Sequence, residues 1–407
     1  MFKTSSLELY KKTQLTTPVR VLHVIDKLSV DGSGIHGATK LLDWLTSYSD
    51  KDKFQFSVCS LRRVEPAGEI FERNRIPIFF LGRHKFDPRT LFDLLKLIER
   101  EQPDILHLHG YGAANFGRIA SLLTGIPNVV HEHAVLVNQP FYQTIIDGLL
   151  SPLTTKAIAV STSVKDFMIE YRSISENCIE VIRNGVPLKS FQSQPKTNNT
   201  NAKDLRAQFD IPENHMVVGI IGRLNPIKGH QYFIEAASQI LQNHTNVTFL
   251  VVGEGELKES LEELAQSLGV AHAVKFTGYR EDIPAFLSII DIVAIASLTE
   301  GGPLVLIEAM AAECAVVSTN TIGLKDAIVE GETGYLVPPQ NSQALAEKIA
   351  ALIGRPSLCK KIAEQAQASV FQFDISETVK AIEKCYAQTV KSVNYTSKIQ
   401  LTKINTI

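Results

Sequence analysis

The 407-residue sequence lacks the features that would mark a disulfide scaffold, a membrane span or a protein that binds polyanions. Its five cysteines are scattered and odd in number, which argues against a disulfide framework or a zinc cluster and favours a reducing compartment. The first residues, MFKTSSLELYKK, contain no apolar signal core, and no apolar run approaches the length of a membrane span. The formal net charge is −2, so no nucleic-acid partner is expected.

The basic stretch at residues 62–89 is a local exception to this balanced charge. It contains Arg62, Arg63, Arg73, Arg75, Arg83, Lys85 and Arg89. Such a run is most often a solvated face of a folded domain. The alternative is a patch that binds an anionic acceptor or rests on a lipid surface. Since the sequence shows neither a signal core nor a membrane span, we expect a cytoplasmic protein. The basic stretch leaves open a peripheral contact with the inner face of the membrane.

The length exceeds what one hydrophobic core usually supports, so two domains are expected. Short apolar runs rich in β-branched residues alternate with helical patterns, which indicates parallel sheets covered by helices on both faces. The expected strands are 19–25, 54–60, 76–81, 104–108, 128–131, 156–161 and 178–182, then 216–222, 247–253, 274–278, 291–297, 315–319 and 334–337. The polar stretch SFQSQPKTNNTNA at 190–202, between the two series, has the composition of a linker.

The predicted fold is therefore α/β, with two Rossmann-like, doubly wound parallel-sheet domains that face a cleft. We assign residues 1–190 to a first domain, 191–204 to the linker and 205–373 to a second domain. The last helical segment, about 374–407, is expected to pack back on the first domain or to be mobile. Ligands of open α/β sheets bind beyond the carboxyl ends of the strands, so both domains should contribute to one site.

Two glutamates, Glu300 and Glu308, bracket the run EGGPLVLIE. Pro303 is suited to the first turn of a helix, because its missing N–H would be unpaired there in any case. The free N–H groups of a helix N-terminus form a ready site for phosphate. Two acids that could bind hydroxyls therefore flank a site for an anion, and the run predicts a sugar–phosphate site.

Each domain opens with a loop that follows its first strand. In the second domain, GRLNPIKG at 222–229 places Arg223 and Lys228 five residues apart, where they could stabilise a departing diphosphate without a metal. The alternative is that both make surface ion pairs. In the first domain, residues 32–37 satisfy the dinucleotide pattern G-x-G-x-x-G but begin several residues after the strand ends. An NADP site stays open as a lesser alternative.

Several histidines lie near predicted strand ends. His109 should lie near the cleft, whereas His107, on the same strand face, is interpreted as a core histidine. The run His131-Glu132-His133 could supply metal ligands, but adjacent strand residues point to opposite faces and no fourth partner is evident. We therefore expect no metal site.

Together these motifs resemble the retaining glycosyltransferases of family 4, which have the GT-B fold. The resemblance runs from about residue 19 to 350 and rests on several motifs in the family's order. In the second domain they are GRLNPIKGH (222–230), VVGEGELKESLEELA (251–265), VKFTGYREDIPAFL (274–287), SLTEGGPLVLIEAMA (297–311) and GETGYLVPP (331–339). The first domain adds the glycine loop (31–37), HLHG (107–110), VSTSVKDFM (160–168) and VIRNGVP (181–187).

The resemblance assigns roles to residues of the second domain. Arg223 and Lys228 would bind the nucleotide diphosphate. Glu308 would hold the ribose hydroxyls of the donor, and Glu300 a hydroxyl of the transferred sugar. Backbone contacts to phosphate and sugar would come from Gly301, Gly302, Pro303 and Leu304. The family often has Gly-Phe-Gly after the first glutamate, so the variant Gly301-Gly302-Pro303 limits any inference about the sugar.

Further roles concern the base and the first domain. Gly278 and Tyr279 would lie beside the base, Gly34 would approach the phosphates, and His109 would contact the sugar near the reaction centre. In this family the departing phosphate is thought to help deprotonate the acceptor, so no protein nucleophile, metal or cofactor is implied.

The sequence thus predicts a metal-independent, retaining glycosyltransferase that uses a nucleotide-sugar, with UDP-sugar as the expected donor. The acceptor would be a glycan, a lipid-linked sugar or a small molecule. One alternative is a sugar-nucleotide isomerase of the 2-epimerase type, for which Glu132 is the first domain's only plausible proton-transfer carboxylate. Another is a non-catalytic partner subunit that binds nucleotide-sugar.

Overall fold

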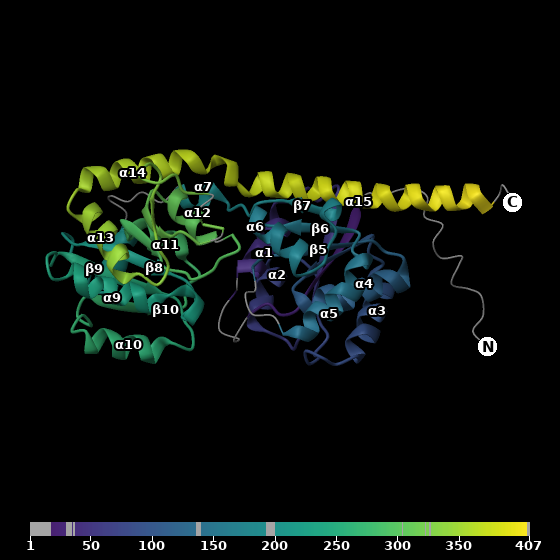
Figure 1. Ribbon diagram of the computed structural model, residues 1–407, viewed down its shortest axis with the longest axis horizontal. Coiled ribbons are helices and arrows are strands. Elements are labelled where there is room, and N and C mark those ends of the chain that lie inside the picture. Colours follow the sequence, from purple (N-terminus) through teal and green to yellow (C-terminus); the bar gives the residue numbers. More distant parts are fainter. Residues whose placement is uncertain are drawn as a thin grey trace.

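The computed structural model describes residues 18–29, 35, 37–135, 140–192, 200–302, 304–321, 323–324 and 327–404, with backbone alone for 200–201 and 392–404. Two α/β domains lie side by side, and a long C-terminal helix runs along the first of them (Figure 1). No helix in the described part of the chain is long and apolar enough to cross a membrane.

The first domain is built on a seven-stranded parallel sheet in the order β3-β2-β1-β4-β5-β6-β7. Its central strand β4 is buried along its whole length, as expected for a sheet covered on both faces. The strands are β1 Val19–Ile25, β2 Phe54–Ser60, β3 Ile78–Phe80, β4 Ile105–His109, β5 Asn128–Glu132, β6 Lys156–Ala159 and β7 Ile179–Val181. The helices are α1 Gly37–Tyr48, α2 Glu69–Arg73, α3 Arg89–Glu101, α4 Tyr111–Thr124, α5 Phe141–Leu150 and α6 Thr162–Glu170.

The second domain repeats this plan with a six-stranded sheet in the order β10-β9-β8-β11-β12-β13. Its strands are β8 Met216–Ile221, β9 Val247–Val252, β10 Val274–Gly278, β11 Ile292–Ile295, β12 Ala315–Thr319 and β13 Tyr335–Val337. Its helices are α7 Leu188–Gln192, α8 Thr200–Gln208, α9 His230–Ile240, α10 Lys258–Ser267, α11 Ile283–Ile289, α12 Leu304–Ala311, α13 Ser342–Ile353 and α14 Pro356–Ser369. The prediction of two doubly wound parallel-sheet domains is confirmed.

The chain crosses between the domains at two adjacent points. Val186 donates its N–H to Phe373 O at 2.9 Å, and Ile375 donates to Val186 O at 2.9 Å. Beyond the first crossing, Val186, Leu188 and Phe191 pack into the core of the second domain, and the linker residues 193–199 lie outside the described part. Beyond the second crossing, helix α15 (Ile375–Ile404) packs against α1 in the first domain.

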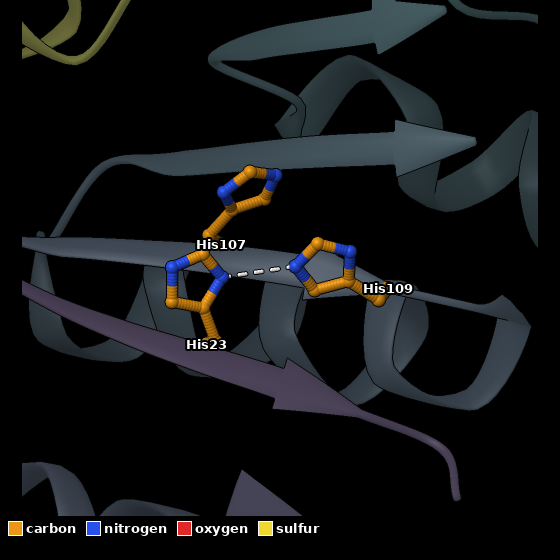
Figure 2. Close-up of side chains that lie close together, drawn as sticks. All are labelled: His23, His107 and His109. Atoms are coloured by element: carbon orange, nitrogen blue, oxygen red, sulfur yellow. Dashed lines mark hydrogen bonds between the residues drawn. The ribbon is translucent and has the colours of Figure 1, made fainter. Parts of the chain in front are cut away.

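Five histidines form an array on one face of the first sheet: His23, His107, His109, His131 and His133. Residues two apart on a strand share a face, and the strand register places His23 beside His107 and His109 beside His131. His23 Nδ1 lies 3.0 Å from His109 Nε2, as Figure 2 shows, and His107 Nε2 lies 3.2 Å from His131 Nδ1. Burial lowers the pKa of His23 to about 3 and the pKa values of His107, His109 and His131 well below 6.5, so these rings are neutral near pH 7.

A hydrogen bond from Tyr386 joins the C-terminal helix to this array. The Tyr386 hydroxyl lies 2.6 Å from His107 Nδ1, and both residues are fully buried. Burial raises the pKa of Tyr386 well above its usual value, so the neutral hydroxyl can donate to the ring nitrogen. The same part of α15 contributes Val379, Ile382 and Cys385 to a hydrophobic cluster with strand residues of the first sheet.

We expect the substitution Tyr386→Phe to destabilise the protein by about 1–3 kcal/mol, because it keeps the buried ring but leaves His107 Nδ1 without a partner. Urea unfolding followed by circular dichroism measures the change. The control is Tyr48→Phe at an exposed position, where the effect should stay within about 0.5 kcal/mol. Equal effects of the two substitutions would show that the bond to His107 contributes nothing.

Candidate active site between the two domains

The loops that follow the strands of both sheets meet in the cleft, and the Glu300–Glu308 run lies where they meet. Asn184 of the first domain donates its side-chain N–H to Gly302 O at 3.2 Å. A Cβ added to Gly301 would lie only 2.1 Å from His133 O, so the two backbones are in contact across the cleft. Pro303 lies outside the described residues, and Leu304 is the first residue of α12.

Glu300 is paired with a cation that the sequence also placed in the site. Lys228 Nζ forms an ion pair with Glu300 Oε1, which also accepts a hydrogen bond from Ser297 Oγ at 2.7 Å. The Asn225 side chain accepts from the N–H of Lys228 at 3.2 Å and so fixes the turn that carries the lysine. The turn ends at Gly229, whose φ is +66° and whose added Cβ would lie 2.1 Å from Ala296 O, so only glycine fits there.

Glu308 is buried in α12 and forms an ion pair across the cleft. Its Oε1 lies 2.6 Å from Nζ of Lys40, which α1 of the first domain supplies. A buried carboxylate is costly without a cation, so this pair links the position of α12 to that of α1. The sequence analysis missed Lys40, since no spacing in the chain connects it to the second domain.

Arg223 lies at the start of the loop that carries Lys228 and is half-buried. Within the described ranges, no carboxylate is within ion-pair distance of its guanidinium. The cleft therefore holds one more cation than the two ion pairs account for. The five residues Glu300, Glu308, Lys40, Arg223 and Lys228 thus carry two negative and three positive charges.

Gly278 and Tyr279 close the cleft at the end of β10. The backbone N–H of Ile35 donates to the Tyr279 hydroxyl at 3.3 Å, which brings the glycine loop of the first domain to this point. The N–H of Tyr279 donates to Glu254 Oε2 at 3.1 Å, so Glu254 positions this turn. The sequence analysis included the run around Glu254 among the motifs of the family but gave Glu254 no role. Gly34 lies outside the described residues.

His109 does not have the environment that a sugar contact requires. It is buried, its Nε2 faces His23 Nδ1, and its Nδ1 lies 2.9 Å from His133 Nε2. With both ring nitrogens engaged, none is left for a substrate. His133 is partly exposed and its backbone carbonyl lies against Gly301, so the backbone at His133, rather than the His109 ring, borders the predicted sugar site. The sequence analysis considered His133 only as a metal ligand.

The expectation that no further ligand stands near His131 and His133 is wrong. Two trios, His23–His107–His109 and His109–His131–His133, each bring one nitrogen per residue to within 4.8 Å of one another. The partners come from β1 and β4 through strand register, which a search of neighbouring sequence positions does not detect.

Glu132 points to the opposite face of β5 and is bound in a buried network of charges. Its Oε2 lies 3.3 Å from Arg172 Nε, and Arg172 Nη1 lies 2.9 Å from Asp147 Oδ2. Asp147 Oδ1 in turn lies 3.3 Å from Arg118 Nη1. Burial raises the pKa of Glu132, which Arg172 opposes. This carboxylate is therefore held by structural partners.

Comparisons with known sequences agree with this arrangement. Residues 36–190 match the family described as Glycosyltransferase Family 4, and residues 201–369 match Glycosyl transferases group 1. The UDP-Gal:alpha-D-GlcNAc-diphosphoundecaprenol alpha-1,3-galactosyltransferase of Escherichia coli is 30% identical over 262 residues, which cover 62% of this chain and 66%, just under two thirds, of that relative. The alpha-D-kanosaminyltransferase of Streptomyces kanamyceticus is 27% identical over 284 residues, or 67% of this chain and 73% of the relative.

Comparison with solved structures gives the same fold. The crystal structure of Anabaena Alr3699/HepE in complex with UDP and glucose aligns with a TM-score of 0.78 and 24% identity, covering 91% of this chain and 99% of the other. The two family matches together cover every strand of both sheets except β1. The chain belongs to glycosyltransferase family 4 and has the GT-B fold.

Proposed function

We propose that this glycosyltransferase moves a sugar from a nucleoside-diphosphate sugar, with a UDP-sugar as donor, to an acceptor with retention of anomeric configuration. The observation that carries the proposal is the set of charges in the cleft: Arg223, two lysine–glutamate pairs and the N-terminal end of α12 between them. The E. coli relative is named for a UDP-Gal donor, and the Alr3699/HepE structure contains UDP and glucose. These names support the choice of donor.

In the proposed mechanism, the donor diphosphate lies between Arg223 and Lys228. Lys228 leaves Glu300 for the phosphate, and the freed Glu300 carboxylate accepts hydrogen bonds from hydroxyls of the sugar. Glu308 accepts from the ribose hydroxyls while Lys40 keeps its charge compensated. In this exchange each carboxylate keeps a partner: Glu300 accepts from the sugar hydroxyls, and Glu308 stays paired with Lys40. Neither is left as an unpaired buried charge.

The proposed transfer needs no protein nucleophile. As the bond between the sugar and the phosphate oxygen breaks, negative charge develops on the diphosphate, and fixed Arg223 and Lys228 donors stabilise it. The same phosphate accepts the proton of the acceptor hydroxyl. The acceptor therefore attacks the sugar on the face from which the phosphate departs, and the anomeric configuration is retained. We assign the sugar contact that the sequence gave to His109 to the backbone at His133, because the carbonyl of His133 lies beside Gly301.

The acceptor is proposed to be a glycan or a lipid-linked sugar. The E. coli relative is named for an acceptor on diphosphoundecaprenol. The isomerase alternative loses support, because Glu132 is bound to Arg172 on the face of β5 opposite His131 and His133. A time course followed by NMR separates the two reactions, since an isomerase converts the donor without any acceptor.

Lys228→Ala and Glu308→Gln should each lower kcat/KM at least about 100-fold, because each removes a charge-assisted contact to the donor. The assay is donor turnover, including slow hydrolysis, across UDP-, GDP- and ADP-sugars. Lys360→Ala removes an exposed lysine of α14 that pairs with Glu364; it is the matched control and should leave kcat/KM unchanged. Urea unfolding of each variant separates loss of contact from loss of fold. Unchanged kcat/KM in both cleft variants would contradict the donor-binding roles assigned to Lys228 and Glu308.

Transfer is further proposed to be independent of metal ions. Arg223 and Lys228 supply the positive charge that a divalent ion would otherwise supply. In the histidine trios, the two ring nitrogens of His109 already lie within hydrogen-bond distance of His23 and His133. Protein dialysed against EDTA should retain its full rate, with less than one equivalent of metal by mass spectrometry. Loss of activity on dialysis, restored by zinc or manganese, would contradict metal independence and direct attention to the histidine trios.

A further inference from the structure

Helix α5 buries two polar side chains and exposes several large apolar ones. Its sequence is FYQTIIDGLL, and the two buried residues are Gln143 and Asp147. Phe141 is 80% exposed and Leu149 is 72% exposed, with Tyr142 and Ile145 exposed between them. A surface helix of a globular domain normally has the opposite arrangement. The outward face of α5 carries no charged side chain.

Buried ion pairs fix this orientation of the helix. Asp147 accepts from Arg118 and Arg172, both of which are buried beneath α5. Rotating the helix to bury its apolar face would take Asp147 away from two buried cations, which is strongly unfavourable. Residues 141, 145 and 149 are four apart and so form one outward stripe. The exposed stripe is therefore a fixed feature of the first domain.

The apolar surface continues onto the turn between β3 and α3. Phe86 is exposed, and its ring meets that of Tyr142 edge-on at 6.1 Å between centroids. Lys85 Nζ lies 5.3 Å from the centre of the Phe86 ring. We call Phe86, Phe141, Tyr142, Ile145 and Leu149 the apolar patch.

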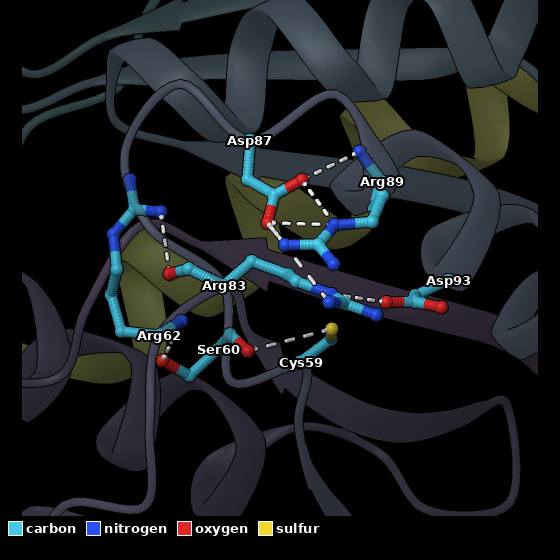
Figure 3. A network of polar contacts seen from close by, with 7 residues as sticks. All are labelled: Cys59, Ser60, Arg62, Arg83, Asp87, Arg89 and Asp93. Atoms are coloured by element: carbon cyan, nitrogen blue, oxygen red, sulfur yellow. Dashed lines mark hydrogen bonds and ion pairs between the residues drawn. The ribbon is translucent and has the colours of Figure 1, made fainter.

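Cations outnumber acids beside the apolar patch. In Figure 3, Asp87 pairs with Arg89 and Arg83, and Arg83 also pairs with Asp93. Arg62 instead donates to the carbonyl of Arg83, and in the described ranges neither Arg62 nor Lys85 has a carboxylate within ion-pair distance. Four cations, Arg62, Arg83, Lys85 and Arg89, thus stand against three acids, Asp87, Asp93 and Asp26, whose carboxyl interacts electrostatically with Arg62 and Lys85, and one positive charge is in excess.

We propose that the apolar patch docks on the anionic surface of a lipid bilayer, with α5 lying in the interface. An uncharged apolar face with aromatic residues, flanked by lysine and arginine, is typical of helices that lie in the headgroup region. At 10 residues the helix is about 15 Å long, too short to span and suited to lie flat. The excess positive charge matches anionic headgroups, whereas an apolar protein partner would gain nothing from it.

The apolar patch is connected to the cleft through strand β5. Helix α5 follows β5 in the chain, and His133 at the end of β5 contacts Gly301 of the donor loop. An acceptor whose lipid part stays in the bilayer could therefore present its sugar to the cleft of the docked protein. This last step rests on the proposed function, whereas docking itself does not.

Co-sedimentation of the full chain with vesicles tests the docking. We expect binding to vesicles of equal parts phosphatidylcholine and phosphatidylglycerol, and at least about tenfold weaker binding to phosphatidylcholine alone. The double substitution F141S/L149S should lower binding to the anionic vesicles about tenfold or more. Lys85→Ala should weaken binding to anionic vesicles only. The matched control is Phe371→Ser, at an exposed apolar position of the second domain, and it should bind like the wild type.

Two results would overturn the proposal. One is that the wild type does not bind anionic vesicles, or that F141S/L149S binds them equally well. The other is concentration-dependent self-association by light scattering that F141S/L149S abolishes, which would make a second copy the occupant of the apolar patch. Donor hydrolysis by F141S/L149S should equal that of the wild type. If hydrolysis is absent in both while vesicle binding follows the prediction, the proposed function fails and the docking stands.

Discussion

The ion pair between Lys40 and Glu308 is the contact on which the arrangement of the cleft depends. It joins α1 of the first domain to α12 of the second, and its carboxylate is almost completely buried. A charge in that position requires a partner, so the two domains are held with their loops facing each other. The backbone contact of Gly301 with His133 and the hydrogen bond from Ile35 to Tyr279 follow from the same closure.

Buried polar groups inside the first domain constrain the helices α15 and α5 in a similar way. On one face of β5, His131 takes part in the array that ends at Tyr386 and so anchors α15. On the other face, Glu132 joins Arg172 and Asp147, which turns the apolar side of α5 outward. Buried polar groups thus determine how both helices lie, in agreement with the cost of leaving such groups unpaired.

The sequence predicted what depends on contiguous residues. The alternation of apolar runs located the strands of both sheets, because central strands of parallel sheets are buried on both faces. The pairing of Lys228 with Glu300 joins two motifs that were recognised separately. Lys40, Glu254 and the contact of His133 with Gly301 were missed, since each depends on strand register or on closure of the cleft. The outward apolar face of α5 was missed as well, because a buried Asp147 is visible only with its two arginines in place.

The central claim is that the cleft charges bind a nucleoside diphosphate and exchange partners when they do so. A crystal structure of the protein with UDP tests it most directly. The account predicts the diphosphate within hydrogen-bond distance of Arg223 and Lys228, the ribose hydroxyls at Glu308, and Lys228 no longer paired with Glu300. UDP bound away from Arg223, with Lys228 still on Glu300, would contradict the account.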